Sequence, residues 1–151
     1  MNAMSRLKVI LLVLVVVLSV GILAGCGPAK LVDGVYKVEA ATYDTHGFKP
    51  QLEVTVASGK VTAVFYEEVD KNGILKSADE KYAEEMKDVN GTYPAKAYQE
   101  LEDRLIAKQT ATIDVVAGAT TSSKDFKTLA KYVLEKMAVK GDTTPAVVPI
   151  A

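Results

Sequence analysis

The fold is decided by residues 51–66, which read QLEVTVASGKVTAVFY. The first six of these residues alternate between polar and apolar side chains, so every second residue points to the same face of an extended chain. The apolar face of this run carries Leu52, Val54 and Val56. Ser58-Gly59-Lys60 has the composition of a tight turn, and a second β-rich run follows it over 61–66. The stretch therefore predicts a β-hairpin.

Elements on either side of the hairpin extend this prediction. Residues 35–40 alternate weakly and suit a strand, so three consecutive strands predict an antiparallel meander. The turn residues of 70–73 end the sheet. A helix then runs from a cap at Ser77 or Asp79 to about Asp88, and Asn90-Gly91 breaks it. A second helix begins at Pro94 and ends near Lys108.

The last helix has the clearest pattern in the chain. Its apolar residues recur at helical spacing, and they are Phe126, Leu129, Ala130, Val133, Leu134 and Met137. The stretch 122–125 supplies an N-cap and Gly141 a stop. Residues 110–116 predict a short isolated strand before it, and 143–151 predict either a docked or a frayed tail. The order of elements predicts an α+β fold in which a small antiparallel sheet, the N-terminal three-strand meander, packs with two to three helices.

The N-terminus predicts an export signal. Arg6 and Lys8 precede an almost wholly apolar run over 9–23, which is shorter than a comfortable membrane span. The run ends in Leu23-Ala24-Gly25-Cys26, which resembles the bacterial lipobox. This resemblance implies a diacylglycerol anchor on Cys26 and cleavage just before it. The alternative is an uncut signal anchor with an inert thiol.

The predicted segments follow from this cleavage. They are a signal peptide at 1–25, a lipidated tether at 26–33, a domain at 34–141 and a C-terminal tail at 142–151. Without the first 25 residues, 16 basic residues stand against 19 acidic ones, a net charge of −3. This acidic balance argues against a nucleic-acid partner. Cys26 is the only cysteine, so the domain needs a substantial hydrophobic core in place of a disulfide.

The stretch Asp114-Val115-Val116-Ala117-Gly118-Ala119-Thr120-Thr121 lies between the predicted strand and the last helix. Gly118 and Ala119 leave the loop almost without side chains, so a ligand can approach the backbone. Thr120 and Thr121 offer hydroxyls, and a helix N-terminus with unpaired N–H groups favours a phosphate. The residues alone leave two interpretations open, an ordinary tight turn with a helix cap or a phosphate site.

The same stretch resembles the flavinylation motif of the FMN-binding domain family, in which an Asp, two variable residues and a Ser or Thr precede Gly-Ala-Thr. Ala117 stands where the family usually has the hydroxyl residue. The wider resemblance covers most of 34–140 and is strongest to the single-domain lipoproteins described as membrane-associated immunogens. It implies that a flavin transferase moves FMN from FAD onto Thr120 as a phosphoester, with Asp114 as a recognition or activating element. Thr121 is the alternative acceptor.

The function implied by this resemblance is that of an electron carrier, without substrate chemistry of its own. Covalent FMN would accept electrons from a membrane redox donor on the extracytoplasmic face of the cell membrane and pass them to an external acceptor. The first alternative is a lipoprotein that binds a phosphorylated small molecule without covalent flavin, which Ala117 favours. The second is a small extracytoplasmic flavin reductase.

Other polar residues predict little chemistry. His46 is the only histidine, and it indicates either a solvated turn or a contact to the flavin or its phosphate. Without partners it forms no metal site, so no metal is expected. Glu67-Glu68 and Glu84-Glu85 are interpreted as solvated faces. The tyrosines are expected mainly in the core and at its rim, with one or two available to stack on an isoalloxazine ring.

Overall fold

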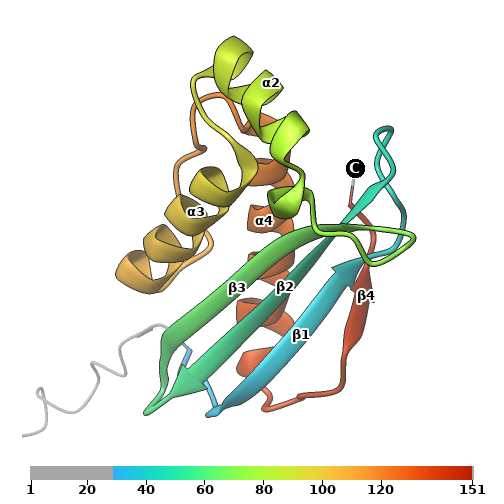
Figure 1. Ribbon diagram of the computed structural model, residues 1–151. Coiled ribbons are helices and arrows are strands. Elements are labelled where there is room, and N and C mark those ends of the chain that lie inside the picture. The colour runs from blue at the N-terminus through green and yellow to red at the C-terminus, as the bar shows by residue number, and fades with distance from the viewer. Residues whose placement is uncertain (1–28, 151) are drawn as a thin grey trace, which may run out of the picture.

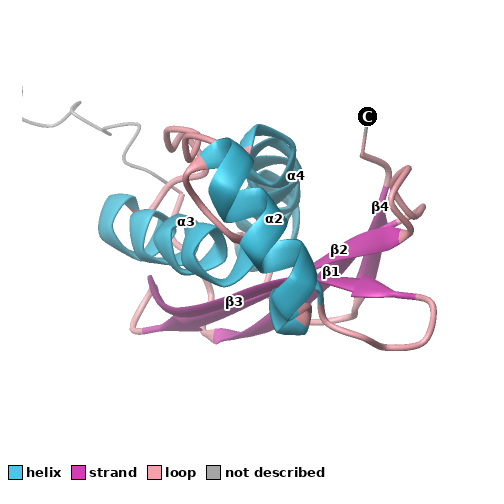
Figure 2. Ribbon diagram, turned by 45° about the horizontal axis from the view of Figure 1, so that its top comes forward, coloured by secondary structure: helices cyan, strands magenta, loops and turns pink. Residues whose placement is uncertain are grey.

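The computed structural model describes residues 29–150, so the predicted signal peptide and Cys26 lie outside the described residues. Within these residues the chain forms one mixed sheet with helices on one of its faces (Figures 1 and 2). The sheet order is β3-β2-β1-β4. The strands are β1 (Gly34–Ala40), β2 (Phe48–Ala57), β3 (Lys60–Asp70) and β4 (Ala146–Val148). The predicted α+β fold and its N-terminal meander are confirmed.

The β2–β3 hairpin forms as the sequence pattern predicts. Ser58 and Gly59 both have positive φ, at 53° and 72°, which is the backbone of the tight hairpin turn whose twist matches that of the strands. The Asp33 carboxylate accepts hydrogen bonds from the amides of Ser58 and Gly59 at 2.9 and 2.8 Å. These two bonds hold the pKa of Asp33 below its ordinary value. The chain just before β1 is thereby attached to the turn.

The C-terminal segment docks, which settles the alternative left open by the sequence. β4 pairs in parallel with β1, with Glu39 opposite Val147. The sheet is therefore mixed and larger than the meander alone. Val148 is buried, and the amide of Ala41 donates to its carbonyl oxygen at 2.8 Å. Three residues are enough here because β1 supplies a preformed partner strand.

Three α-helices and two short helical turns complete the described fold. They are η1 (Lys76–Ala78), α2 (Glu80–Asn90), α3 (Pro94–Lys108), α4 (Thr120–Tyr132) and η2 (Val133–Ala138), a π-helical turn that continues α4. Asp79 caps α2 by accepting a hydrogen bond from the Tyr82 amide at 2.9 Å, and Pro94 opens α3, as predicted. No helix among residues 29–150 has the length and hydropathy needed to cross a membrane.

Two local predictions are wrong. Within the described chain, residues 110–116 form no strand, although they are rich in β-branched side chains. The last helix begins at Thr120 with Ala119 as its N-cap, two residues before the predicted cap region of 122–125. Ser123 lies inside the first turns of α4, where its Oγ accepts a hydrogen bond from the Val116 amide at 3.0 Å. This polar residue supports the loop before the helix and does not cap the helix.

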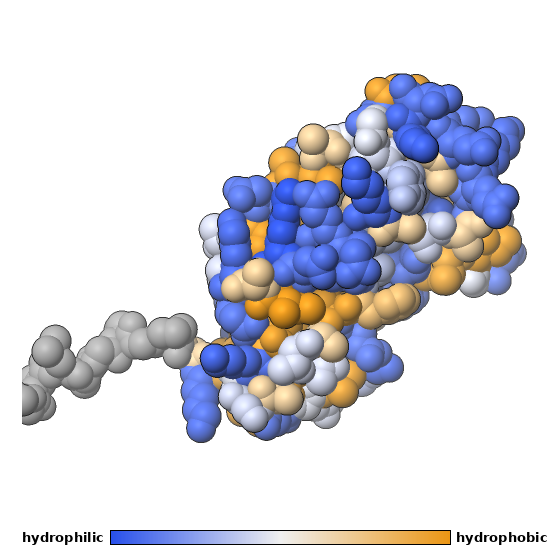
Figure 3. Space-filling view, turned by 60° about the vertical axis from the view of Figure 1, so that its left-hand side comes forward, coloured by the Kyte–Doolittle hydropathy of each residue, from blue (hydrophilic) through white to orange (hydrophobic). Residues whose placement is uncertain are grey.

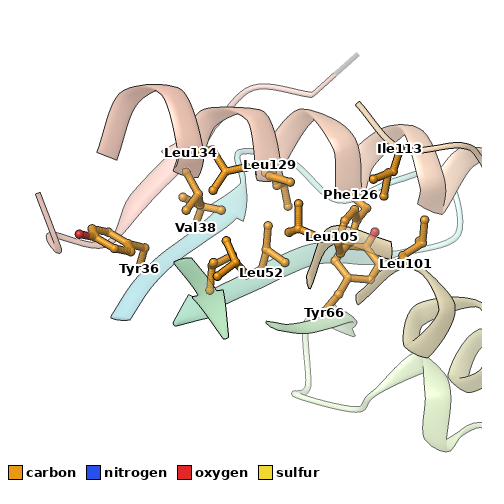
Figure 4. Packing of buried hydrophobic residues seen from close by; sticks show 14 of the residues in the cluster. Tyr36, Val38, Leu52, Tyr66, Leu101, Leu105, Ile113, Phe126, Leu129 and Leu134 are labelled. Atoms are coloured by element: carbon orange, nitrogen blue, oxygen red, sulfur yellow. The ribbon is translucent and has the colours of Figure 1, made fainter. Parts of the chain in front are cut away.

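The hydrophobic core lies between the sheet and α3 and α4 (Figure 4). Phe126 of α4 packs edge-on against Tyr66 of β3, with ring centroids 5.2 Å apart. Tyr66 also meets Tyr98 of α3 edge-on at 4.9 Å. Burial of large side chains such as these contributes roughly 1.5–3 kcal/mol each. The aromatic contacts therefore join both helices to the same strand.

The free edge of β3 has hydrogen-bond partners at its start, middle and end. Gln109, just after α3, accepts a hydrogen bond from the Val61 amide and donates one to the Val61 carbonyl, both at 2.8 Å. Glu102 of α3 accepts from the Tyr66 amide at 2.7 Å. At the far end, the Asp70 amide donates to the carbonyl of Ile74 at 3.0 Å. Side chains of α3 thus replace a neighbouring strand.

Candidate functional site

Three buried side chains attach the stretch before α4 to the hydrophobic core. Ile113, Val116 and Ala119 are buried, at every third position. The residues between them, and the two that follow, are exposed, namely Asp114, Val115, Ala117, Gly118, Thr120 and Thr121. Both the acid and the candidate acceptor of the motif therefore face solvent, and Ala119 belongs to the core. The structure places the other predicted site residues, Asp114, Gly118, Thr120 and Thr121, on one exposed segment.

The N-terminus of α4 is left open by its cap residue. Ala119 has no side-chain acceptor, so no side chain of the described residues caps the helix. The first helical amides, at 120–122, have no acceptor within residues 29–150. By contrast, Asp79 caps α2 with its carboxylate. Three amides, the positive end of the helix dipole and the exposed hydroxyls of Thr120 and Thr121 together suit an anion such as a phosphate.

Gly118 has a packing role that the sequence did not indicate. Its φ is +80°, a conformation that side chains other than glycine rarely adopt. A Cβ at this position would overlap the backbone oxygen of Asn90 and would lie 3.0 Å from Cγ2 of Thr92. The loop between α2 and α3 therefore lies against the backbone of Gly118. This glycine allows close approach of protein as well as of any ligand.

Asp114 is held by α3. The Lys108 ammonium lies 3.1 Å from Oδ2 of Asp114, and its hydrogen bond and charge hold the pKa of that carboxyl below its ordinary value. The Asp114 side chain is nevertheless 84% exposed. Arg104 donates from Nη1 to the backbone carbonyls of Asp114 and Val115, at 2.7 and 3.0 Å. Neither basic residue was predicted as part of the site, although both lie on one face of α3 at a spacing of four.

A buried polar cluster lies beneath the first turns of α4, and here the sequence prediction is wrong. Glu67 and Glu68 are buried, not solvated, because η1 folds over the end of β3. Lys76 contacts the Glu68 carboxylate at 2.6 Å, and Ser77 donates its hydroxyl to Glu67. Burial lowers the pKa of Lys76, but Glu68, Tyr82 and Asp44 together outweigh that effect, and the pKa lies above its ordinary value. Glu84 and Glu85 are exposed, as expected.

The cluster reaches α4 through Tyr66 and Asp125. The Tyr66 hydroxyl bonds Oε1 of Glu68 at 3.1 Å and the backbone oxygen of Ser122 at 3.3 Å. Asp125 is 7% exposed. Burial, together with the Glu68 and Asp44 carboxylates, raises the pKa of Asp125 to about 6. One ammonium therefore faces several carboxylates, which favours a bound proton on Asp125 below about pH 6.

Two buried hydroxyls flank the motif without a protein partner. Oγ1 of Thr92 and the phenol of Tyr98 form no hydrogen bond with any described residue. Thr92 touches the Gly118 loop, and Tyr98 packs against Tyr66 beneath α4. Burial raises the pKa of the Tyr98 phenol well above its ordinary value, so it remains a donor. Unpaired buried donors next to an uncapped helix are compatible with a polar group bound at this end of the domain.

The remaining sequence candidates are His46 and the tyrosines. His46 is exposed in the β1–β2 loop, where its amide donates to the Asp44 carboxylate at 2.8 Å. Tyr36, Tyr66 and Tyr98 are core residues, and Tyr43 is exposed. In Figure 3 most of the visible face is hydrophilic, and hydrophobic surface forms a narrow band with scattered patches. The structure thus gives no special contact to His46 among the described residues.

The site lies at the opposite end of a long helix from the start of the described chain. Thr120 is the first residue of α4, and Ala138 is the last of η2. The Val32 amide donates to the Ala138 carbonyl at 2.8 Å, so residues 29–33 attach to that lower end (Figure 1). With a rise of 1.5 Å per residue, the two ends are roughly 25 Å apart. The motif and the N-terminal segment therefore occupy opposite ends of the domain.

Comparison with known proteins gives consistent matches. The family model described as FMN-binding domain matches residues 33–135. The 15 kDa lipoprotein of Treponema pallidum (strain Nichols) is 36% identical over 115 residues, which cover 76% of this chain and 82% of that protein. The crystal structure of the CPE2226 protein from Clostridium perfringens superposes with a TM-score of 0.78 at 42% identity, covering 80% of this chain and 99% of that one. The family model covers β1 to the start of η2 and includes the motif before α4.

Proposed function

The chain belongs to the FMN-binding domain family, and from that premise we propose that it carries FMN joined by a phosphoester to Oγ of Thr120. The observation that carries the proposal is the N-terminus of α4, where an exposed threonine begins a helix whose cap residue, Ala119, leaves the first amides unpaired. Those amides and the helix dipole favour a phosphate. The exposed motif also allows a second protein to reach Thr120.

The proposed attachment is a transfer of the FMN group from FAD to the threonine hydroxyl. The Thr120 oxygen forms a bond to the FMN phosphorus, the bond from that phosphorus to the oxygen bridging to AMP breaks, AMP leaves, and the hydroxyl proton is released. A flavin transferase catalyses the transfer, and Asp114, with its exposed carboxylate, is its recognition or activating element. When attached, FMN supplies one- or two-electron chemistry. Thr121 is the neighbouring alternative acceptor.

We further propose that the protein is a lipoprotein, anchored through Cys26 in the cell membrane with its domain on the extracytoplasmic side. Support comes from the lipobox-like Leu23-Ala24-Gly25-Cys26 and from the similarity to a protein named as a lipoprotein. The roughly 25 Å between the two ends of α4 and η2 would then hold the motif away from the bilayer. A covalent link also keeps the cofactor on the protein outside the cytoplasm, where a reversibly bound ligand would dissociate and be diluted.

The role that follows is electron transfer between a membrane redox donor and an external acceptor. Tyr66, Tyr98 and the carboxylates beneath α4 are fixed by hydrogen bonds and packing, so this end of the domain is preorganised. A rigid site needs little rearrangement when charge changes. The protein in this role needs no substrate pocket and acts as a carrier.

The decisive test uses the threonines as a matched pair. Wild type, Thr120→Ala and Thr121→Ala are each produced with a flavin transferase and examined by intact mass and by flavin fluorescence in a denaturing gel. We expect wild type and Thr121→Ala to gain one FMN less one water, and Thr120→Ala to gain nothing. An unmodified wild type would refute the covalent attachment. A modified Thr120→Ala would move the linkage to another residue.

A second candidate is a binding module that holds a phosphorylated small molecule without a covalent bond. Ala117 favours it, because the family motif usually has a hydroxyl residue there. The open helix end serves this function equally well. Calorimetry with free FMN and with inorganic phosphate on unmodified protein tests it. Saturable binding, combined with no mass increase in the presence of the transferase, would select the binding module.

A further inference from the structure

We propose that Arg104 is a positioning residue for the modification of Thr120, so that the transferase recognises a composite of the motif and α3. The proposal rests on the proposed function. Arg104 lies outside the linear motif, ten residues before Asp114. Its guanidinium reaches the motif backbone directly, through the bonds to the carbonyls of Asp114 and Val115.

These two carbonyls need a donor because the motif has no neighbouring strand. Within the described residues, 110–116 pair with no sheet strand. Backbone carbonyls usually find a partner in a strand or a helix. Here one nitrogen of Arg104 serves both at 2.7 and 3.0 Å. An irregular segment is thereby held in one conformation with charge-assisted bonds.

Arg104 is itself held in place. Its other terminal nitrogen pairs with the carboxylate of Glu100, one helical turn earlier on α3. The guanidinium is only partly exposed. From the other side, Ser123 accepts from the Val116 amide and donates to the Ala119 carbonyl at 2.7 Å. The motif is therefore fixed between α3 and α4 before any enzyme binds it.

The side chain of Asp114 is held far less firmly than its backbone. The pair with Lys108 joins two exposed groups, and such pairs contribute little and exchange readily with solvent. Another protein can therefore take the carboxylate without moving the chain. Arg104 fixes the position from which the carboxylate projects, and Lys108 only biases its direction. A preordered segment also lowers the entropy lost on binding.

The test compares Arg104→Gln with Lys96→Gln. Both lose one positive charge from α3, but Lys96 is exposed and has no hydrogen bond or ion pair to the motif in the described structure. Initial rates of FMN transfer from FAD are measured over a range of acceptor-protein concentrations with one transferase. We expect Arg104→Gln to lower kcat/KM by roughly 10- to 100-fold, mainly through KM. Lys96→Gln should match wild type, and Arg104→Lys should be intermediate.

A second readout needs no flavin. Amide hydrogen exchange over 113–118 should be faster in Arg104→Gln and unchanged in Lys96→Gln. Glu100→Gln, which leaves the guanidinium present but less restrained, should show a smaller change in KM and keeps the test valid if Arg104→Gln does not fold. If the Arg104 and Glu100 variants have the same KM and the same amide hydrogen exchange as wild type, the proposal is overturned. If wild type itself accepts no FMN, the proposed function fails instead, and the two failures are distinguishable.

Discussion

Gly118→Ala is expected to destabilise the domain by about 2–5 kcal/mol. The left-handed backbone at Gly118, with φ +80°, costs an alanine about 1–2 kcal/mol. The added Cβ would also press on the carbonyl of Asn90 and the methyl group of Thr92, and overpacking of this kind costs about 1–3 kcal/mol. The loop between α2 and α3 must move to accommodate the methyl group.

Gly73→Ala provides a matched control. Gly73 has nearly the same φ, +82°, but no atom lies within 4 Å of a Cβ built there. Gly73→Ala therefore has the same backbone strain and the same reduction of unfolded-chain entropy as Gly118→Ala, but it introduces no steric clash. Urea denaturation of both variants, with unchanged m-values, should show Gly118→Ala less stable than Gly73→Ala by about 1–3 kcal/mol. Equal stability of the two variants would refute the packing role assigned to Gly118.

Two further perturbations test the polar contacts. In the unfolded chain Asp125 ionises near its ordinary pKa, whereas in the folded protein it ionises near 6, so the folded state loses stability as pH rises from about 4 to about 6. Asp125→Asn should remove this pH dependence and raise the free energy of unfolding by about 1–2 kcal/mol at pH 7.5. Identical pH profiles of stability for wild type and Asp125→Asn in denaturation experiments would contradict this prediction. Gln109→Asn keeps a residue type that tolerates a φ of 57°, but its shorter side chain no longer reaches Val61. We expect it to lower the free energy of unfolding by about 1–3 kcal/mol and to increase self-association in sedimentation experiments. A monomer of unchanged stability would count against edge protection by Gln109.

The parts of the fold that follow local rules were predictable from the sequence. The alternation of 51–56 and the turn at Ser58-Gly59 correspond to a local hairpin whose register the turn fixes. Asp79 and Pro94 mark helix starts through their own backbone and side-chain chemistry. The resemblance predicts Asp114 and Thr120 as the acidic and acceptor positions of the motif, and both residues are exposed.

The parts that depend on distant contacts were not predictable. Ile113 and Val116 look like strand residues, but they anchor a loop whose carbonyls are satisfied by Arg104. Glu67-Glu68 resembles a solvated pair because nothing local shows that η1 folds over β3. The sequence pattern predicts a start of α4 that is too late, because Ala119 is an unusual N-cap without a side-chain acceptor. In each case the deciding partner lies elsewhere in the chain or is missing from the local pattern.

Both margins of the sheet are partly protected against strand addition. Along β3 the outward backbone groups of Val61 and Tyr66 are occupied by α3 and the residue after it. On the other margin β4 is three residues long and lies between Pro145 and Pro149, which lack an amide hydrogen. Copies of this domain that meet edge to edge therefore find only short runs of free hydrogen-bonding groups, which disfavours fibril growth by strand addition.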